Sequence, residues 1–309
     1  MPEVDVWRAL AEALQSGMPC ALLAVADDRG SSPGRRGAVM AVATTGPLCG
    51  TIGGGVAEAT LVGRVTADLR AGSLTAQRVP MEHRPGAPNA SGMICGGSQV
   101  VVVSPLGNGD LLGITTVADA LAAGRSARWS VDPQGWRAVG EQPEGAELAW
   151  TFTHGSGPTH TVHVIGAGHV GSELARSLVA VDFRVVLVDE RPGIATSVAA
   201  HSAHERIALA YEDLADVVAE GAASFAAIMT HSHERDAAAL AALEPLTLGY
   251  LGLLGSTLKI ARLVGAREMP AWFHAPMGLR IGSATPTEIA VSIAAEMIAE
   301  RSGVDSHGR

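Results

Sequence analysis

The chain is poor in aromatic residues and in cysteine, and each scarcity narrows what the protein can be. Aromatic side chains make up only 4% of the 309 residues, so the core must be built from Ala, Val, Leu and Ile. The three cysteines, Cys20, Cys49 and Cys95, are an odd number without zinc-like spacing. We therefore expect a reducing, cytoplasmic setting rather than a disulfide-stabilised secreted protein.

Long apolar runs and basic blocks are also missing. No apolar stretch approaches the length of a membrane span, and the amino-terminal MPEVDVWRALAEAL predicts an amphipathic helix, not a secretory signal. The net charge is −9 and Lys and Arg form no block, which disfavours nucleic acid and anionic membranes as partners. With 47% apolar and 17% charged residues, the chain is too apolar for disorder.

The length exceeds what one hydrophobic core usually serves, so more than one domain is expected. We predict an α/β protein with a smaller N-terminal α/β domain (residues 1–105), a connecting region (106–158), and a Rossmann-type parallel-sheet domain with a C-terminal helix (159–309). The connecting region shows an Ala-rich helix and weak strands around its tryptophans. Residues 79–92, punctuated by proline and glycine, predict irregular structure.

The C-terminal half has the most regular pattern. VHVIG and RVVLVD read as buried strands on either side of a helix over 170–181, and short apolar strands and helices alternate after them. This alternation predicts a parallel sheet covered on both faces. Thr285-Pro-Thr-Glu288 is a capping box with proline at the first helical position, which predicts the start of a last helix.

A GxGxxG motif directly follows the first of these strands. Gly166 permits a tight turn, Gly168 lets the backbone approach a pyrophosphate, and Gly171 lets the following helix pack on the strand. Asp189 ends the next strand, where an acid accepts hydrogen bonds from ribose hydroxyls, and His169 is expected at the rim of the pocket. The motif predicts nucleotide binding, although such a fold can also serve as a scaffold.

Two glycine-rich segments stand out in the N-terminal half. The loop Gly30–Gly37, GSSPGRRG, combines flexible backbone with Ser31, Ser32 and Arg35. The turn Gly50–Gly55 leads into a helix whose first turn carries Glu58, and its last three residues are Gly53, Gly54 and Gly55. Consecutive glycines indicate close approach of the backbone to another group, and N–H groups at a helix start favour an anion. An ordinary turn between strand and helix remains the alternative.

A third segment, Cys95-Gly96-Gly97, precedes a predicted strand over 99–103. A cysteine flanked by two glycines has little side-chain cover, so its sulfur is a candidate reactive or metal-binding atom. A small apolar filler is the alternative. Among the histidines, His231 follows a strand end and is expected as a polar contact in the nucleotide cleft, whereas His231 and His233 are spaced loosely for a zinc pair.

Taken in order, these segments resemble the XdhC/CoxI family, the accessory proteins of xanthine dehydrogenase and carbon monoxide dehydrogenase maturation. The resemblance rests on GSSPGRRGAVM, GTIGGGVAEA, MICGG, VIGAGHVGSELA, VDERP, MTHSHERD, YLGLLGSTLK and GLRIGSATPTEIAVSIAAE. It covers nearly the whole chain and is weakest over residues 106–158. One departure concerns Val56, where many members have a cysteine after the triple glycine.

The resemblance implies a chaperone that binds molybdenum cofactor, as molybdopterin or its cytosine dinucleotide, and delivers it to a molybdenum hydroxylase apoenzyme. On that basis the segments around Ser31, Gly54 and Gly96 would hold the cofactor, and Cys95 would lie near the molybdenum. A cysteine desulfurase is a further expected partner, and we expect a homodimer. The protein is then a maturation factor without a catalytic residue of its own.

Two other hypotheses stay open. An NAD(P)-dependent oxidoreductase would use the Rossmann domain and needs a positioned acid–base group, for which His231 is the best candidate. An interaction protein would keep the Rossmann fold without a ligand.

Overall fold

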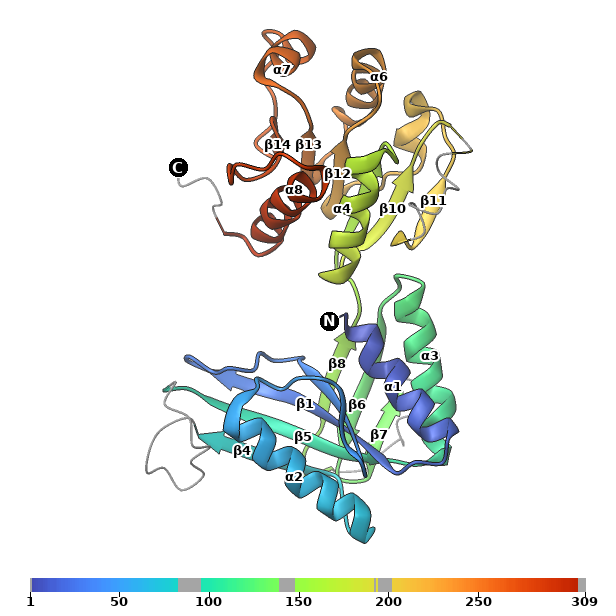
Figure 1. The fold of residues 1–309 in the computed structure, drawn as a ribbon, viewed down its shortest axis with the longest axis vertical. Coiled ribbons are helices and arrows are strands. Elements are labelled where there is room, and N and C mark those ends of the chain that lie inside the picture. Colours follow the sequence, from blue (N-terminus) through green and yellow to red (C-terminus); the bar gives the residue numbers. More distant parts are fainter. Residues whose placement is uncertain (1, 83–95, 139–147, 192, 194–201, 305–309) are drawn as a thin grey trace. The chain divides into compact units, whose positions relative to one another are not determined.

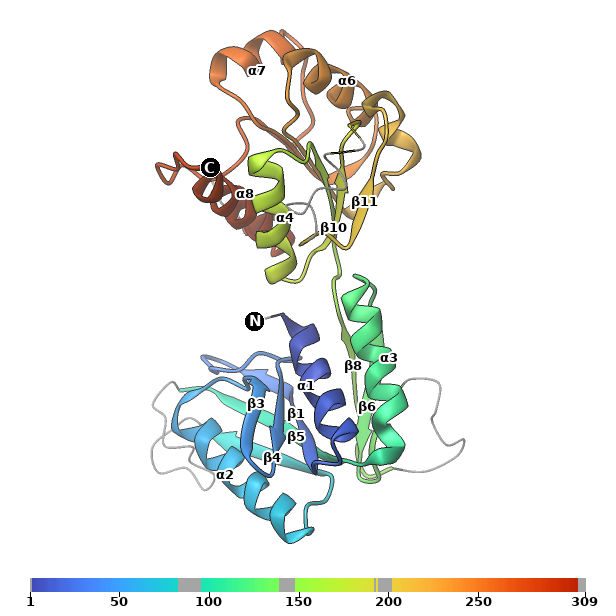
Figure 2. The same ribbon diagram turned by 45° about the vertical axis from the view of Figure 1, so that its right-hand side comes forward.

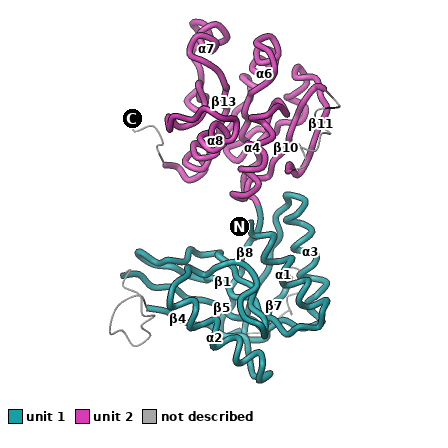
Figure 3. Tube along the Cα trace, viewed as in Figure 1, with its two compact units in different colours: residues 1–157 teal, residues 158–309 magenta. Residues whose placement is uncertain are grey.

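The computed structural model describes residues 2–82, 96–138, 148–191, 193 and 202–304 (Figure 1). The chain divides into two compact units, residues 1–157 and 158–309 (Figure 3). No helix in the described ranges is long and apolar enough to cross a bilayer.

The first unit contains a five-stranded antiparallel sheet in the order β3-β2-β1-β5-β4. Its first elements are α1 (Glu3–Gln15), β1 (Cys20–Arg29), β2 (Val39–Ala43), β3 (Gly46–Gly50), α2 (Gly55–Ala71), β4 (Gln77–Glu82) and β5 (Ser98–Leu106). Successive side chains of β1 point to opposite faces. Leu22 therefore packs in a cluster with α1, and Leu23 packs in a second cluster with α2. Both helices lie beside the strands of this sheet (Figure 2).

The chain continues through η1 (Asn108–Asp110), α3 (Leu111–Ala122), β6 (Ala127–Asp132), β7 (Gly135–Ala138) and β8 (Phe152–Ser156). The three strands form an antiparallel sheet in the order β7-β6-β8. We predicted a connecting region here, and the structure instead builds these elements into the first unit. The reason is packing, because the ring centre of Trp129 lies 5.4 Å from that of Trp7 on α1, and the ring centre of Trp136 lies 6.1 Å from the same point.

The second unit contains a six-stranded sheet in the order β11-β10-β9-β12-β13-β14, and every neighbouring pair is parallel. The elements are β9 (Thr161–Ile165), α4 (His169–Ala180), β10 (Arg184–Val188), β11 (Glu205–Ile207), η3 (Tyr211–Asp216), β12 (Gly221–Ile228), α6 (His233–Leu243), β13 (Leu248–Leu253), α7 (Thr257–Val264), β14 (Phe273–His274) and α8 (Pro286–Arg301). In sequence terms this is the order 3-2-1-4-5-6 of a Rossmann sheet. The predicted fold class is confirmed.

Helices cover both faces of this sheet. On one face α4 and α8 pack against residues such as Val162 and Val185, and on the other η3 and α6 pack against residues such as Ile165 and Val186 (Figure 1). The strands are therefore continuously apolar rather than alternating. The predicted capping box is also present, because the Thr285 hydroxyl accepts from the N–H of Glu288.

The edge strands were missed. Residues 79–82 were predicted to be irregular, but they belong to β4, which pairs with β5. The prediction rested on the prolines and glycines of residues 85–92, and Pro80 fits β4 because a strand at the edge of a sheet tolerates proline where its outer side needs no ladder hydrogen bond. Residues 83–92 of that prediction lie outside the described range. The three-residue β11 and two-residue β14 carry too few residues to show a periodic pattern.

Candidate functional sites

The glycine motif forms the turn between β9 and α4. Gly166 has φ 110°, and a side chain there would overlap the carbonyl oxygen of Met229. A side chain at Gly171 would overlap the carbonyl oxygen of Gly166, because the helix packs directly on the turn. Above Gly168, in contrast, no atom lies within 4 Å of where a side chain would begin. The close packing of the backbone therefore requires glycine at positions 166 and 171, whereas Gly168 leaves open space beside the start of α4.

This room belongs to a cleft of about 700 Å³ at the carboxyl edge of the sheet. Gly168, His169 and Gly171 line it on one side, and Thr230 and His231, which follow β12, line it on another. The remaining lining residues include Arg191, Leu254 and Pro286. The cleft lies between β9 and β12, where the strand order reverses, and this is the ligand position in open α/β sheets. Its volume is within the range of small-molecule sites.

Asp189 occupies the predicted position at the end of β10, but its carboxylate is already saturated. Oδ1 accepts from the backbone N–H and Nε of Arg191 at 3.0 and 2.8 Å, and Oδ2 accepts from Nη2 of Arg191 and the N–H of Ala167 at 2.8 and 2.9 Å. Burial raises the pKa of Asp189, and the hydrogen bonds from Arg191 and Ala167 more than reverse this and lower it. Because a carboxylate offers about four acceptor positions, a ribose hydroxyl could bind only after Arg191 moves away.

A second arginine connects the neighbouring elements. Arg235 at the start of α6 donates to Glu190 at 3.0 Å and to both carboxylate oxygens of Glu212 at 2.8 Å. Its guanidinium also lies 5.3 Å from the ring centre of Tyr211. These contacts hold η3 and α6 beside the end of β10.

Behind Thr230 lies a buried ion pair. Asp236 on α6 is fully buried and accepts from the N–H and the hydroxyl of Thr230 at 3.0 and 2.9 Å. Lys259 on α7 forms an ion pair with Asp236 and donates to the carbonyl oxygen of Leu254 at 2.7 Å. Thr230 and Leu254 both line the cleft, so the pair fixes two parts of its wall.

The histidines do not gather into a metal site within the described ranges. His231 is exposed and lines the cleft, as does His169. His233 begins α6. His204 accepts through Nδ1 from the N–H of Val185 at 3.1 Å, which ties the start of β11 to β10.

In the first unit, three of the predicted segments meet around one side chain. The amide of Gln99 on β5 accepts through Oε1 from the Ser32 hydroxyl (2.9 Å) and the Gly34 N–H (3.2 Å). Its Nε2 donates to the carbonyl oxygen of Ile52 at 3.1 Å. Gln99 is only 3% exposed. The arginine loop, the glycine turn and the start of β5 are thereby joined, and we call this arrangement the Gln99 junction.

Glycine is required within the Gln99 junction because backbone meets backbone. A side chain at Gly53 would begin 2.6 Å from the nitrogen of Gly34, and one at Gly97 would begin 2.6 Å from the nitrogen of Ser32. Gly54 and Gly96 differ, because they have φ 76° and 79° with no atom within 4 Å of an added side chain. Gly53 and Gly97 thus pack directly on neighbouring backbone, whereas Gly54 and Gly96 leave open space.

Glu58 occupies much of the predicted anion site. Its Oε2 accepts from the Thr51 hydroxyl at 2.6 Å and from the N–H groups of Ile52 and Gly54 at 2.8 and 2.9 Å. Partial burial raises the pKa of Glu58, but these hydrogen bonds outweigh it and lower the pKa. The carboxylate of the chain itself therefore neutralises donors that we expected to meet a phosphate. Gly55, at the first position of α2, has φ 68°.

The two arginines of the loop point to different partners. Arg35 donates to Asp28 at 3.1 Å while 76% of its side chain stays exposed. The Arg36 guanidinium lies 5.5 Å from the ring centre of Phe152 on β8. Ser31 is exposed, whereas Ser32 is buried at the Gln99 junction. Cys95 lies outside the described residues, and so does any contact of its sulfur with an arginine or a metal.

Comparison with known families agrees with this architecture. A model of the XdhC Rossmann domain matches residues 162–297, and a model of the XdhC and CoxI family matches residues 13–79. The chain belongs to the XdhC and CoxI family.

Curated relatives in or near this family are longer. A probable xanthine dehydrogenase subunit of Bacillus subtilis (strain 168) is 33% identical over 147 residues, which cover 48% of this chain and 44% of that protein. The uncharacterized protein YqeB of Escherichia coli (strain K12) is 27% identical over 303 residues, which cover 96% of this chain and 46% of that protein. The chain thus spans about half the length of the curated relatives it matches.

A solved structure extends the likeness to the whole fold. A protein from Bacillus halodurans, described as a xanthine dehydrogenase, superposes with a TM-score of 0.76 at 23% identity, covering 100% of this chain and 98% of the other. At 23% identity this match supports the fold of the present chain, and it carries no information about the chain's chemistry.

Several residues that organise these sites escaped the sequence reasoning. A signal for Gln99 was present, because it is a polar residue at the start of an otherwise apolar strand, Gln99–Val103. Arg191 follows Asp189 by two residues, close enough to suggest a pair. Asp236 gave no usable signal, because its partner Lys259 is distant in sequence and only the fold brings the two together.

Proposed function

We propose that this XdhC and CoxI family member binds molybdenum cofactor and delivers it to a molybdenum hydroxylase in the cytoplasm. Family membership and the name of the Bacillus subtilis relative support a link to xanthine dehydrogenase. The observation that carries the proposal is the Gln99 junction, because it brings the Gly30–Gly37 loop, the Gly50–Gly55 turn and the residues directly after Cys95 together.

The groups at this junction suit a phosphorylated pterin. Arg35 is largely exposed and provides positive charge for a phosphate, and the open backbone at Gly54 and Gly96 leaves space for a ligand. Glu58 uses Oε2 for its hydrogen bonds to Thr51, Ile52 and Gly54, and Oε1 takes part in none of these three. A carboxylate oxygen of this kind accepts from the N–H groups of a pterin. Bound molybdenum would supply the centre that the recipient enzyme uses.

The decisive experiment identifies what the protein carries. The full chain is purified from molybdenum-supplied cells, and the released small molecules are analysed by mass spectrometry and the metal by elemental analysis. We expect a pterin and molybdenum in comparable amounts, and activation of an apo-hydroxylase on mixing. Protein that neither carries nor takes up a pterin would refute the proposal.

Matched variants locate the site. Cys95→Ala should lower cofactor retention, whereas Cys49→Ala, on β3 outside the junction, should not. Gly54→Ala should weaken binding because its side chain enters the open space, and Gly72→Ala is the control because Gly72, which caps the C-terminus of α2, also has a positive φ (64°) and open space around it. Equal retention by both members of each pair would place the cofactor elsewhere.

The expected partners need separate measurements. A transient complex with the hydroxylase apoenzyme, and one with a cysteine desulfurase, should be detected by light scattering on mixing. The same measurement on the protein alone tests the homodimer.

An NAD(P)-dependent oxidoreductase is the second candidate, favoured by the cleft beside Gly168. The saturation of Asp189 by Arg191 argues against recognition of a free ribose diol. Absorbance at the nicotinamide band with a substrate panel tests it, and turnover without bound pterin would favour this candidate over the chaperone.

A further inference from the structure

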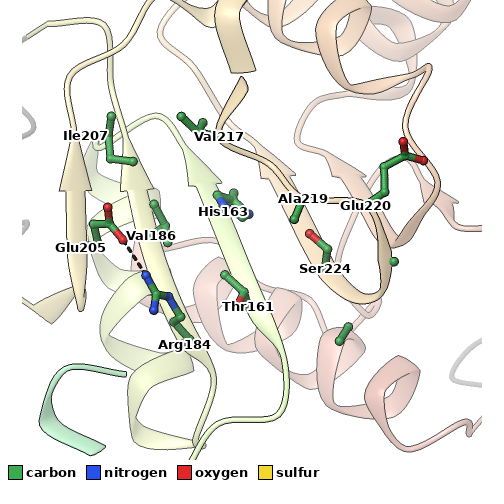
Figure 4. A pocket seen from close by; sticks show the side chains of 12 residues that line it. Thr161, His163, Arg184, Val186, Glu205, Ile207, Val217, Ala219, Glu220 and Ser224 are labelled. Carbon is green, nitrogen blue, oxygen red and sulfur yellow. Dashed lines mark hydrogen bonds and ion pairs between the residues drawn. The ribbon is translucent and has the colours of Figure 1, made fainter. Parts of the chain in front are cut away.

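A second hollow lies in the Rossmann unit, far along the strands from the glycine motif. It has a volume of about 480 Å³ and lies over the amino-terminal halves of β9, β10 and β12, on the face that η3 and α6 cover further along (Figure 4). Thr161 and Ser224 are neighbours across β9 and β12, and His163 is the next residue on the same face. Nothing in the proposed function uses this hollow, which we call the His163 pocket.

Two buried polar atoms in the His163 pocket have no partner. The Nδ1 of His163 and the hydroxyl of Ser224 make no hydrogen bond within the described part of the chain, although the two residues are only 5% and 7% exposed. An unsatisfied buried polar group destabilises a fold, so such groups are rare without a reason. Both residues line the hollow.

The charges around the pocket select against an anionic ligand. At its rim Arg184 is neutralised by Glu205, with 2.6 Å between Nη2 and Oε2 (Figure 4). Glu220 adds negative charge while accepting from the N–H of Thr247 at 2.9 Å. Burial lowers the pKa of His163 more than the nearby carbonyl oxygens of Phe225 and Val217 raise it, so its ring is neutral. An anion would face this negative rim without an unpaired cation.

The shape of the walls adds to the selection. The floor is the surface of the sheet, where Thr161, Ala223 and Ser224 carry small side chains and leave room for a thin molecule. Ile207 and Val217 supply apolar walls. We propose that the His163 pocket binds a small, uncharged, flat heteroaromatic molecule whose edge offers a hydrogen-bond donor beside an acceptor, to His163 and Ser224.

The test uses the full chain and a defined probe. Quinazolin-4(3H)-one is uncharged and carries adjacent N–H and C=O groups, and 1-naphthoate has a similar size but is an anion. The titration is followed by the NMR chemical shifts of the His163 imidazole nitrogens and the Ser224 backbone amide. We expect these chemical shifts to change saturably with quinazolin-4(3H)-one and to stay unchanged with 1-naphthoate. His163→Leu and Ser224→Ala should each weaken binding by about fivefold or more, the effect of one lost hydrogen bond.

Controls separate a ligand site from a structural histidine. Ser292→Ala removes another buried hydroxyl, on α8, and should leave the titration unchanged. Without probe, His163→Leu should melt at the same temperature as the parent or higher, because it removes an unpartnered nitrogen. A lower melting temperature together with unaltered binding in Ser224→Ala would overturn the proposal. So would equal shifts with 1-naphthoate, or shifts produced by a protein partner and by neither compound.

Discussion

Replacing Gln99 by leucine should loosen the first unit at a single point. The substitution keeps the approximate size of the side chain but removes its amide, which joins three segments. The N–H of Gly34 and the carbonyl of Ile52 would then be left without partners in a buried place, whereas the Ser32 hydroxyl can rotate to another acceptor. At about 1–3 kcal/mol for each unsatisfied group, we expect a loss of about 3 kcal/mol in the free energy of unfolding.

Thermal unfolding measures this loss. For a unit of this size about 3 kcal/mol corresponds to a melting temperature lower by about 6–12 °C. Hydrogen exchange adds location: peptides from the Gly30–Gly37 loop and the Gly50–Gly55 turn should lose protection, and peptides from α1 should keep theirs. Gln77→Leu, on the neighbouring strand β4, is the control. It removes only the 3.5 Å hydrogen bond from the Gln77 amide to the carbonyl oxygen of Thr75, and it should change the free energy of unfolding by less than about 0.5 kcal/mol.

Gln99→Glu sharpens the test, because its effect depends on pH. A protonated glutamic acid still donates to Ile52, but an ionised one places negative charge against that carbonyl oxygen. Burial and this repulsion raise the folded-state pKa of the introduced acid above its unfolded value. The variant should therefore be more stable in acid and lose stability as pH rises through that folded-state pKa. If Gln99→Leu melts within about 1 °C of the parent with unchanged exchange, the junction does not hold the loops.

Three further outcomes follow from the described contacts. Hydrogen bonds lower the pKa of Glu58, so its stabilising contribution is present above its unfolded pKa and is lost as pH falls through the folded one; the melting temperatures of the parent and Glu58→Gln should therefore converge in acid scans. Because Arg191 occupies the carboxylate of Asp189, the cleft should prefer a nucleotide with a 2′-phosphate, and calorimetry should show 2′,5′-ADP binding about fivefold or more tightly than 5′-AMP. Arg191→Ala should reverse that order of affinities. An unchanged order would remove both residues from the site. Lys259→Met leaves Asp236 buried without its cation and should cost about 3–5 kcal/mol in chemical denaturation, whereas a cost below about 1 kcal/mol would mean that the pair is not coupled.

The sequence predicted the Rossmann unit well because its signals are local. The turn at Gly166, the acid at Asp189 and the capping box at Thr285 each depend on a few consecutive residues. Short apolar strands alternating with helices restrict the possible topologies further, since crossovers between parallel strands have a fixed handedness. Family models then matched the same region.

Contacts between distant residues were harder to predict. The glycines of the first unit were expected to approach a ligand, and at Gly34, Gly53 and Gly97 the backbone approaches other parts of the chain instead. Composition alone cannot separate these cases, because glycine is equally suited to both. Likewise, Glu58 was expected beside an anion, and its own carboxylate accepts the available hydrogen bonds.

Residues 106–158 show a different limit. Weak strand patterns around Trp129 and Trp136 gave no indication of what these strands would pack on, because the partner, Trp7, lies at the other end of the first unit in sequence. Pairing of such remote segments is decided by shape and burial, which a local pattern does not contain.

The packing of indoles around Trp7 of α1 gives the molecule an internal optical reporter. Four of the five tryptophans belong to residues 1–157. The ring centre of Trp7 lies 5.4 Å from that of Trp129 and 6.1 Å from that of Trp136. Rings this close give near-ultraviolet circular dichroism that disappears when packing is lost. Trp272 is the sole indole of residues 158–309. A Trp272→Phe protein would therefore emit tryptophan fluorescence from residues 1–157 only, and that fluorescence would follow the melting of this unit alone.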